Sequence, residues 1–125
     1  MDLTPKVAPG RQQITGYGNG GFRVSGIFHT GPVLVLPERT QPWTVTGLAE
    51  LSQASLADLF TAELPVELLL IGCGRYAAPL PLAIRAFLKG RGVAVDPMDT
   101  GAACRTYNVL LGEGRHVGAA LIPID

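Results

Sequence analysis

The sequence predicts a single α/β domain, and two features of its 125 residues carry this prediction. After Gly47 the chain alternates between helix and strand patterns, which is typical of crossover connections and a largely parallel sheet. Before Gly47 it shows short strand patterns separated by glycine and proline turns, typical of a β ribbon or meander. We expect this β half either to extend one edge of the sheet or to cover one of its faces.

Composition excludes several classes of protein. Lys plus Arg number 10 and so do Asp plus Glu, so the chain has no basic footprint for nucleic acid. Only 16% of the residues are charged and 47% are hydrophobic, and such an exterior favours a protein partner or a homo-oligomer. No apolar run approaches the roughly 18 residues of a membrane span. Residues 1–13 lack the pattern of a secretory signal or a mitochondrial presequence, so we expect a cytoplasmic protein.

The β half begins after a segment that is poor in apolar residues. Residues 1–13 are expected to form a flexible N-terminal arm, followed by one domain over 14–125. Asn19-Gly20 predicts a tight hairpin turn, and Ser25-Gly26 permits a second bend. Short strands are expected at 14–17, 22–25, 27–29 and 33–36, with one more at 43–46 and a loop between Pro37 and Pro42.

The second half is divided by helix caps and glycines. Ser55 with Asp58 resembles a capping box that opens a helix over 55–64. Pro79 and Pro81 are accommodated in the first turn of a helix that runs to about Lys89. Asp99 or Thr100 caps a last helix that ends near Gly112 or Gly114. Strands are expected at 67–71, 93–95 and 116–124.

The stretch 98–111 is the most informative part of the chain, because it places polar side chains at a strand-to-helix junction. Gly72, Cys73 and Gly74 follow the preceding strand, and parallel strands deliver both loops to the same end of a sheet. We therefore expect a small crevice there that could hold an anion or a carboxylate. The candidate ligand- or partner-binding residues are Gly72, Cys73, Gly74, Thr100, Arg105, Tyr107, Asn108 and Arg115.

A structural interpretation of the same residues stays open. Asp99 would cap the helix, and Arg105 and Tyr107 would satisfy backbone groups or line a partner surface. Arg115 would then only pair with Glu113 on the surface, where such a pair contributes at most about 1 kcal/mol.

A nucleotide site is not favoured. Gly72-x-Gly74-x-x-Ala77 follows a strand and superficially matches the dinucleotide fingerprint, with Asp96 near the end of the next strand. The fingerprint needs its helix to begin at the glycines, whereas Pro79 and Pro81 move the helix start downstream.

The sequence contains no complete catalytic set. Cys73 and Cys104 lack CxxC spacing, so we expect two free thiols and no zinc site. The alternatives are a reactive Cys73, whose loop N–H groups would favour the thiolate, or a redox pair of the two cysteines. His29 and His116 have no metal-like spacing to another ligand. We expect no metal and no cofactor.

A family resemblance rests mainly on the C-terminal third. The strongest residues are Met98-Asp99-Thr100, Ala103, Arg105-Thr106-Tyr107-Asn108, Leu110, Glu113, Arg115, Val117, Ala119-Ala120-Leu121 and Pro123. Weaker matches are Gly18, Gly21-Phe22, Val35-Leu36-Pro37, Ile71-Gly72, Gly74 and Pro79. With these residues the chain resembles a family of uncharacterised bacterial and archaeal proteins that includes the mitochondrial respiratory complex I assembly factor 3.

The resemblance implies a three-layer α/β domain with a mixed, mostly parallel central sheet of about five strands and an extra N-terminal β layer. It implies no established enzymatic activity, and its eukaryotic members resemble assembly helpers that bind protein partners near the inner membrane. Cys73 stands where the family usually has Thr, which disfavours a nucleophilic thiol. The sequence thus predicts a non-enzymatic adaptor for a membrane-associated, complex I-like assembly, with peripheral membrane association. The alternative is a small-molecule or anion-binding enzyme or sensor that uses the crevice.

Overall fold

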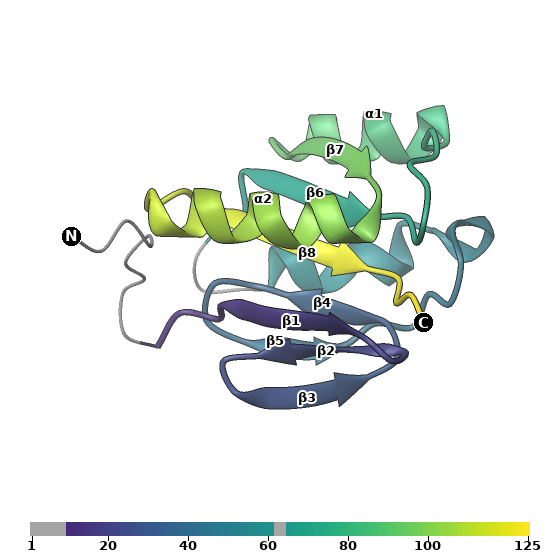
Figure 1. Cartoon of the computed structure of the whole chain (residues 1–125). Coiled ribbons are helices and arrows are strands. Elements are labelled where there is room, and N and C mark those ends of the chain that lie inside the picture. Colours follow the sequence, from purple (N-terminus) through teal and green to yellow (C-terminus); the bar gives the residue numbers. More distant parts are fainter. Residues whose placement is uncertain (1–9, 62–64) are drawn as a thin grey trace.

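The computed structural model describes residues 10–61 and 65–125, which form two β-sheets, two α-helices and two 3₁₀ helices (Figure 1). The smaller sheet contains β1 (Ile14–Gly18), β2 (Gly21–Val24) and β3 (Ile27–Thr30). The larger sheet contains β4 (Val33–Val35), β5 (Thr40–Pro42), β6 (Leu68–Gly72), β7 (Ala94–Met98) and β8 (Val117–Leu121). The helices are η1 (Leu48–Glu50), η2 (Ala54–Phe60), α1 (Leu82–Gly90) and α2 (Thr100–Gly112).

The smaller sheet is an antiparallel meander in the order β1-β2-β3. Asn19 and Gly20 both have positive φ, 54° and 75°, as the type I′ turn between two strands requires. Ser25 and Gly26 repeat this pattern with φ values of 48° and 87°. Both turns predicted from the sequence are therefore confirmed.

The larger sheet is mixed and has the strand order β5-β4-β8-β6-β7. β6 pairs in parallel with β7 and with β8, whereas β4 pairs antiparallel with β5 and β8. Two of its four pairings are therefore antiparallel, because the β half supplies two strands to the sheet as a hairpin. A mostly parallel set of pairings is not confirmed.

Two expectations for the middle of the chain are wrong. The additional strand lies at Thr40–Pro42 and not at 43–46. Trp43 instead packs in the core, and its indole N–H donates to the Ser55 carbonyl at 2.8 Å. The helix expected over 55–64 is the shorter 3₁₀ helix η2, whose N-cap is Gln53 without a side-chain bond, so no Ser55–Asp58 capping box forms. Ser55 bonds Ser52 instead, and residues 62–64 lie outside the described residues.

Of the two α-helices, α2 begins with a side-chain cap and α1 does not. Pro81 is the N-cap of α1, so the helix starts eight residues after Gly74, at Leu82. The expectation that Pro79 and Pro81 lie in its first turn is wrong, since both precede Leu82. The dinucleotide geometry is therefore absent at this loop. The Asp99 side chain caps α2 by accepting from the Ala102 N–H at 2.9 Å, as the sequence predicted.

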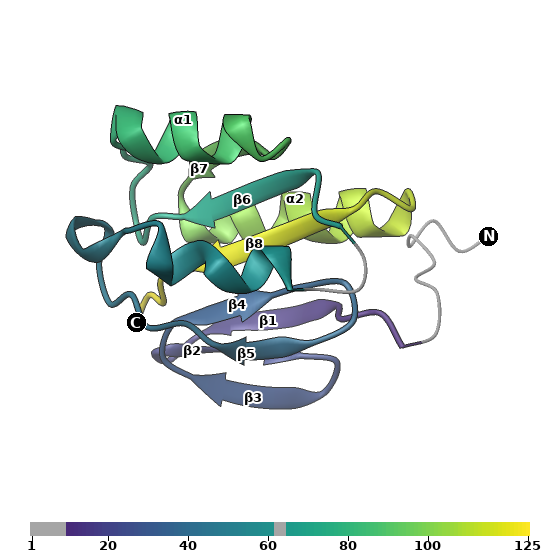
Figure 2. The same cartoon turned by 180° about the vertical axis from the view of Figure 1, so that it is seen from behind.

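The larger sheet is covered by a separate apolar cluster on each face. One cluster joins η2 and α1 to the sheet through side chains such as Leu56, Ile84 and Ile71. The other joins α2 and the smaller sheet to the opposite face through side chains such as Tyr107 and Phe22. Figures 1 and 2, seen from opposite sides, show α2 and η2 on opposite faces of this sheet.

The predicted N-terminal arm is described only from residue 10 onward, and residues 1–9 lie outside the described residues. Gln12 is tied to the domain: its N–H donates to the Pro37 carbonyl, and its side-chain oxygen accepts from the Thr40 hydroxyl, both at 2.8 Å. Within residues 10–61 and 65–125, no helix has the length and apolar character needed to cross a bilayer.

Candidate functional site

The exits of β6 and β7 meet, as their parallel pairing requires. The Cys73 N–H donates to the Met98 carbonyl at 2.8 Å. Gly74 and Thr100 then exchange two bonds of 2.8 Å: the Thr100 hydroxyl accepts from the Gly74 N–H, and the Gly74 carbonyl accepts from the Thr100 N–H. The two loops therefore meet at the same end of the sheet, as expected from the sequence.

This junction is closed by its own hydrogen bonds and packing. Thr100 is completely buried, and its hydroxyl donates to the Ile122 carbonyl at 2.6 Å. A Cβ on Gly72 would lie 2.9 Å from the Leu121 side chain and 3.0 Å from the Thr100 hydroxyl. The glycine thus allows β6, β8 and the start of α2 to approach one another. The polar groups that could have faced a ligand are used to join these segments.

The next polar residues of α2 anchor the β half. The Tyr107 hydroxyl is buried and lies 2.8 Å from the Gln12 carbonyl and 3.4 Å from the Leu36 carbonyl. Burial raises the pKa of this hydroxyl far above its ordinary value of 10.0, and the negative charge of Glu38 adds to the increase. Tyr107 therefore acts as a neutral donor to backbone carbonyls, as the structural interpretation expected.

Asn108 binds the outer edge of β1. Its carboxamide accepts from the Ile14 N–H at 2.9 Å and donates to the Ile14 carbonyl at 2.6 Å. These are the two bonds that a neighbouring strand would make, so α2 closes the edge of β1 at this residue.

Arg105 is an α2 candidate that, together with Asn108, lines a pocket. It is exposed, and its guanidinium donates to the Tyr17 hydroxyl at 3.1 Å. A pocket of about 200 Å³ lies between β1 and α2. Its lining residues are Ile14, Thr15, Gly16, Tyr17, Cys104, Arg105 and Asn108. Arg105 therefore lies on a different face of α2 from the closed junction at Thr100.

The remaining candidates are dispersed. Arg115 is exposed in the turn after α2. Cys73 is half-buried against the cluster that contains η2 and α1, whereas Cys104 belongs to the cluster on the other face of the sheet. Both thiols are free, and the sheet between them prevents a direct bridge. Burial raises the pKa of the Cys104 thiol to about 12, although Arg105 acts in the opposite direction.

No cluster of potential metal ligands occurs in the part of the chain that the structure describes. There, no group of three or more His, Cys, Asp or Glu side chains is placed to hold an ion. His116 lies 3.9 Å from the Glu67 carboxylate, and the two side chains come from neighbouring strand starts.

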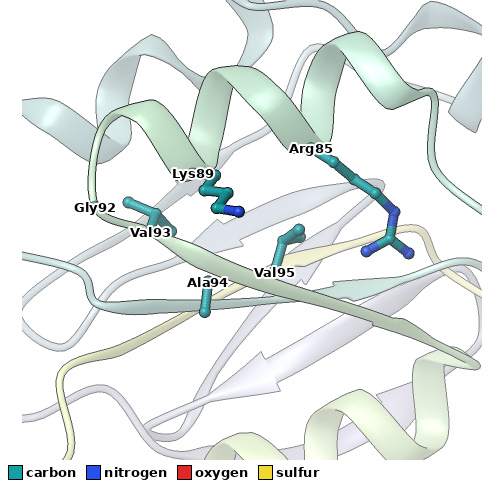
Figure 3. A pocket seen from close by; sticks show the side chains of 6 residues that line it. All are labelled: Arg85, Lys89, Gly92, Val93, Ala94 and Val95. Atoms are coloured by element: carbon teal, nitrogen blue, oxygen red, sulfur yellow. The ribbon is translucent and has the colours of Figure 1, made fainter.

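A larger groove, which was not predicted from the sequence, lies between α1 and β7. It has a volume of about 480 Å³ and is lined by Arg85, Lys89, Gly92, Val93, Ala94 and Val95. Figure 3 shows Arg85 and Lys89 extending from α1, with Val95 pointing up toward the helix and Ala94 pointing away from it. The available signal was the spacing of two basic residues four apart on an amphipathic helix, directly before an apolar strand.

Known proteins resemble this chain over most of its length. An uncharacterised protein of Rhodobacter capsulatus is 44% identical over 115 residues, which are 92% of this chain and 87% of that protein. NADH dehydrogenase (ubiquinone) 1 alpha subcomplex assembly factor 3 of Bos taurus is 32% identical over 98% of this chain and 67% of that protein. The same assembly factor of Danio rerio is 35% identical over 98% of this chain and 71% of that protein. The chain thus spans about two thirds of the length of these assembly factors.

Solved structures share the fold. A crystal structure from Bartonella henselae, described as an outer membrane protein, has a TM-score of 0.84 and 38% identity and covers 94% of this chain and 98% of its own. A solution structure from Bordetella pertussis, described as an Mth938-like domain, has a TM-score of 0.79 and 30% identity, with coverage of 98% and 92%. The family model described as protein of unknown function (DUF498/DUF598) matches residues 14–122. The chain belongs to this family, which includes uncharacterised bacterial proteins and the complex I assembly factors.

Proposed function

We propose that this protein is a non-enzymatic adaptor that binds other proteins and assists assembly of a membrane-associated, complex I-like respiratory complex. The similarity to the complex I assembly factors carries this proposal, because it extends over 98% of the chain and not over one motif. The protein would act from the cytoplasmic side and associate with the membrane peripherally, through its partner.

The hydrogen bonding of α2 supports a binding role over catalysis. Thr100, Tyr107 and Asn108 are the polar residues that would equip a reactive crevice, and each bonds backbone groups of the chain itself. Such residues hold a surface in shape and do not turn over a substrate. The accessible features are a basic groove at the edge of the larger sheet and exposed apolar side chains on the smaller one, including Ile27 and Phe28.

Partner capture tests the proposal. The chain, carrying an affinity tag, is expressed in its own cells in place of the untagged protein, and co-purified proteins are quantified by mass spectrometry. Subunits or assembly factors of the respiratory NADH dehydrogenase should be enriched over capture with the tag alone. Recovery of only the tagged chain, with normal levels of the complex after deletion of the gene, would reject the role.

A second candidate is a small-molecule or anion sensor, which the Arg105–Tyr17 contact at the pocket beside β1 favours. Arg105 supplies a cation there, and Tyr17 a hydroxyl. Calorimetric titration with inorganic phosphate and simple carboxylates tests this candidate, with Arg105→Ala as the variant and Arg75→Ala as the control. Heat of binding that disappears only in Arg105→Ala would favour the sensor, and identical titrations for all three proteins would eliminate it.

A further inference from the structure

The groove between α1 and β7 lies along an unpaired edge of the larger sheet. β7 is the last strand in the order β5-β4-β8-β6-β7. The Ala94 N–H and the Met98 carbonyl both point toward β6, where they bond the flanking residues Glu67 and Cys73. Because backbone groups alternate along a strand, those of Val95 and Pro97 point to the open edge. Val95 therefore offers an N–H and a carbonyl to an added strand, and Pro97, which has no N–H, ends the pairing.

The side chains that line the groove carry charge of one sign, whereas Asp96 lies on β7 outside this lining. Arg85 and Lys89 lie one helical turn apart on α1, and they are the charged side chains that line the groove. Within residues 10–61 and 65–125 the ion pairs are Arg75–Asp125 and His116–Glu67, so neither groove cation has a carboxylate partner there. The floor beneath them is apolar, from Val93 and Val95.

We propose that this groove binds an extended acidic segment of a protein partner, which pairs with β7 as an added strand and places carboxylates against Arg85 and Lys89. Strand addition of this kind draws affinity from main-chain bonds and specificity from side-chain pockets. The inference rests on the proposed adaptor function and specifies the chemistry of the segment that the adaptor recognises.

Other occupants match the groove less well. Two copies of this chain that paired their β7 edges across a two-fold axis would bring four cations together. An anionic lipid headgroup would meet the cations but would leave the open backbone groups of Val95 without a partner. An acidic strand satisfies both the cations and the edge.

A labelled peptide tests the groove directly. The probe is a short peptide of alternating glutamate and valine, and its binding is followed by fluorescence anisotropy. The groove variant is Arg85→Glu/Lys89→Glu, and the matched control is Arg23→Glu/Arg75→Glu, which makes the same change in net charge outside the groove. All four residues are exposed, and circular dichroism is used to check that both variants are folded. The groove variant should bind about tenfold more weakly or worse, while the control stays within about twofold of the wild type.

Three results would overturn the inference. The first is failure of the wild type to bind the peptide, or equal losses in both variants. The second is undiminished binding of the same peptide N-methylated on alternate residues, since such a peptide cannot pair with a strand. The third is groove-dependent binding of vesicles of phosphatidylcholine and phosphatidylglycerol, or groove-dependent dimerisation in sedimentation, without groove-dependent peptide binding.

The groove and the adaptor role can fail separately. If the groove variant restores the respiratory complex in deleted cells as well as the wild type does, the groove is not the assembly surface and the inference falls, while the adaptor role stands. If the peptide binds through the groove but deletion leaves the complex unchanged, the strand-binding groove stands and the respiratory role falls.

Discussion

Asn108 on α2 and Ile14 on β1 bond each other as two adjacent β-strand residues would, although they lie 94 positions apart in the sequence. The carboxamide substitutes for a neighbouring strand, with contacts of 2.9 and 2.6 Å to the two backbone groups of Ile14. This link holds the smaller sheet against the helix, and α2 in turn packs on β6 and β8. The polar motif on α2 is therefore a joint between the two halves of the chain.

Asn108→Ala should lower the free energy of unfolding by about 1–3 kcal/mol, because it leaves both Ile14 backbone groups without their partner. Urea denaturation followed by circular dichroism measures the change. Val109→Ala is the matched control on the same helix, since Val109 is exposed, and it should change stability by less than about 0.5 kcal/mol. Equal effects of the two substitutions would contradict the role assigned to Asn108.

Thr100→Val should be more harmful than Thr100→Ser, although valine has nearly the shape of threonine. Valine removes the hydroxyl that bonds the Gly74 N–H and the Ile122 carbonyl, which are then buried without a partner at a cost of about 2–3 kcal/mol. Serine keeps both bonds and loses one methyl group, which costs about 1 kcal/mol. Thermal and urea unfolding of the three proteins would refute a closed junction if valine were the better replacement.

Two glycines should respond differently to alanine. A Cβ on Gly72 would meet the Leu121 side chain at 2.9 Å and the Thr100 Cα at 3.1 Å, so Gly72→Ala should cost about 2–3 kcal/mol. A Cβ on Gly101 would meet only the ends of partly exposed side chains, first the Tyr17 hydroxyl at 2.6 Å. The free energy of unfolding of Gly101→Ala should therefore stay within about 1 kcal/mol of the wild-type value, because Tyr17 can move and alanine favours the helix. The order of the two melting temperatures checks this difference.

Stability should fall at alkaline pH because of buried Cys104. Its pKa is raised to about 12 in the folded chain, from an ordinary 9.0 that applies when the chain unfolds. Between these two pH values the unfolded state releases the thiol proton while the folded state retains it. The contribution of the Cys104 thiol to stability is therefore fully present below pH 9.0 and is lost as the pH rises toward about 12. From about pH 8 to about pH 10.5, the free energy of unfolding of Cys104→Ala should fall by about 2 kcal/mol less than that of the wild type. The same pH dependence in both proteins would contradict a buried thiol.

The sequence predicted most elements because their signals are local. The Asn19-Gly20 turn and the Asp99 cap depend on residues close together in the chain, and both form as expected. The strand at Thr40–Pro42 could not be found, because it contains Pro42 and forms only by pairing with β4.

The sequence predicted correctly that Thr100 meets the loop at Gly74, but not that the polar groups there bond one another. Tyr107 and Asn108 were expected in the same crevice, but they bond the β half instead. Whether a polar group faces solvent or a backbone partner depends on contacts across 22 to 95 positions of sequence. The groove was missed because its basic residues lie on α1 and its open edge belongs to β7, and only the strand order shows that β7 is terminal.

The amount of fully assembled NADH dehydrogenase in membranes of cells that lack this protein tests the adaptor role most directly. Native gel electrophoresis with an in-gel activity stain measures it, and the wild-type gene supplied in trans is the control. We predict a clear loss of the assembled complex on deletion and its recovery with the wild-type gene. An unchanged amount of assembled complex in the deleted cells would contradict the account.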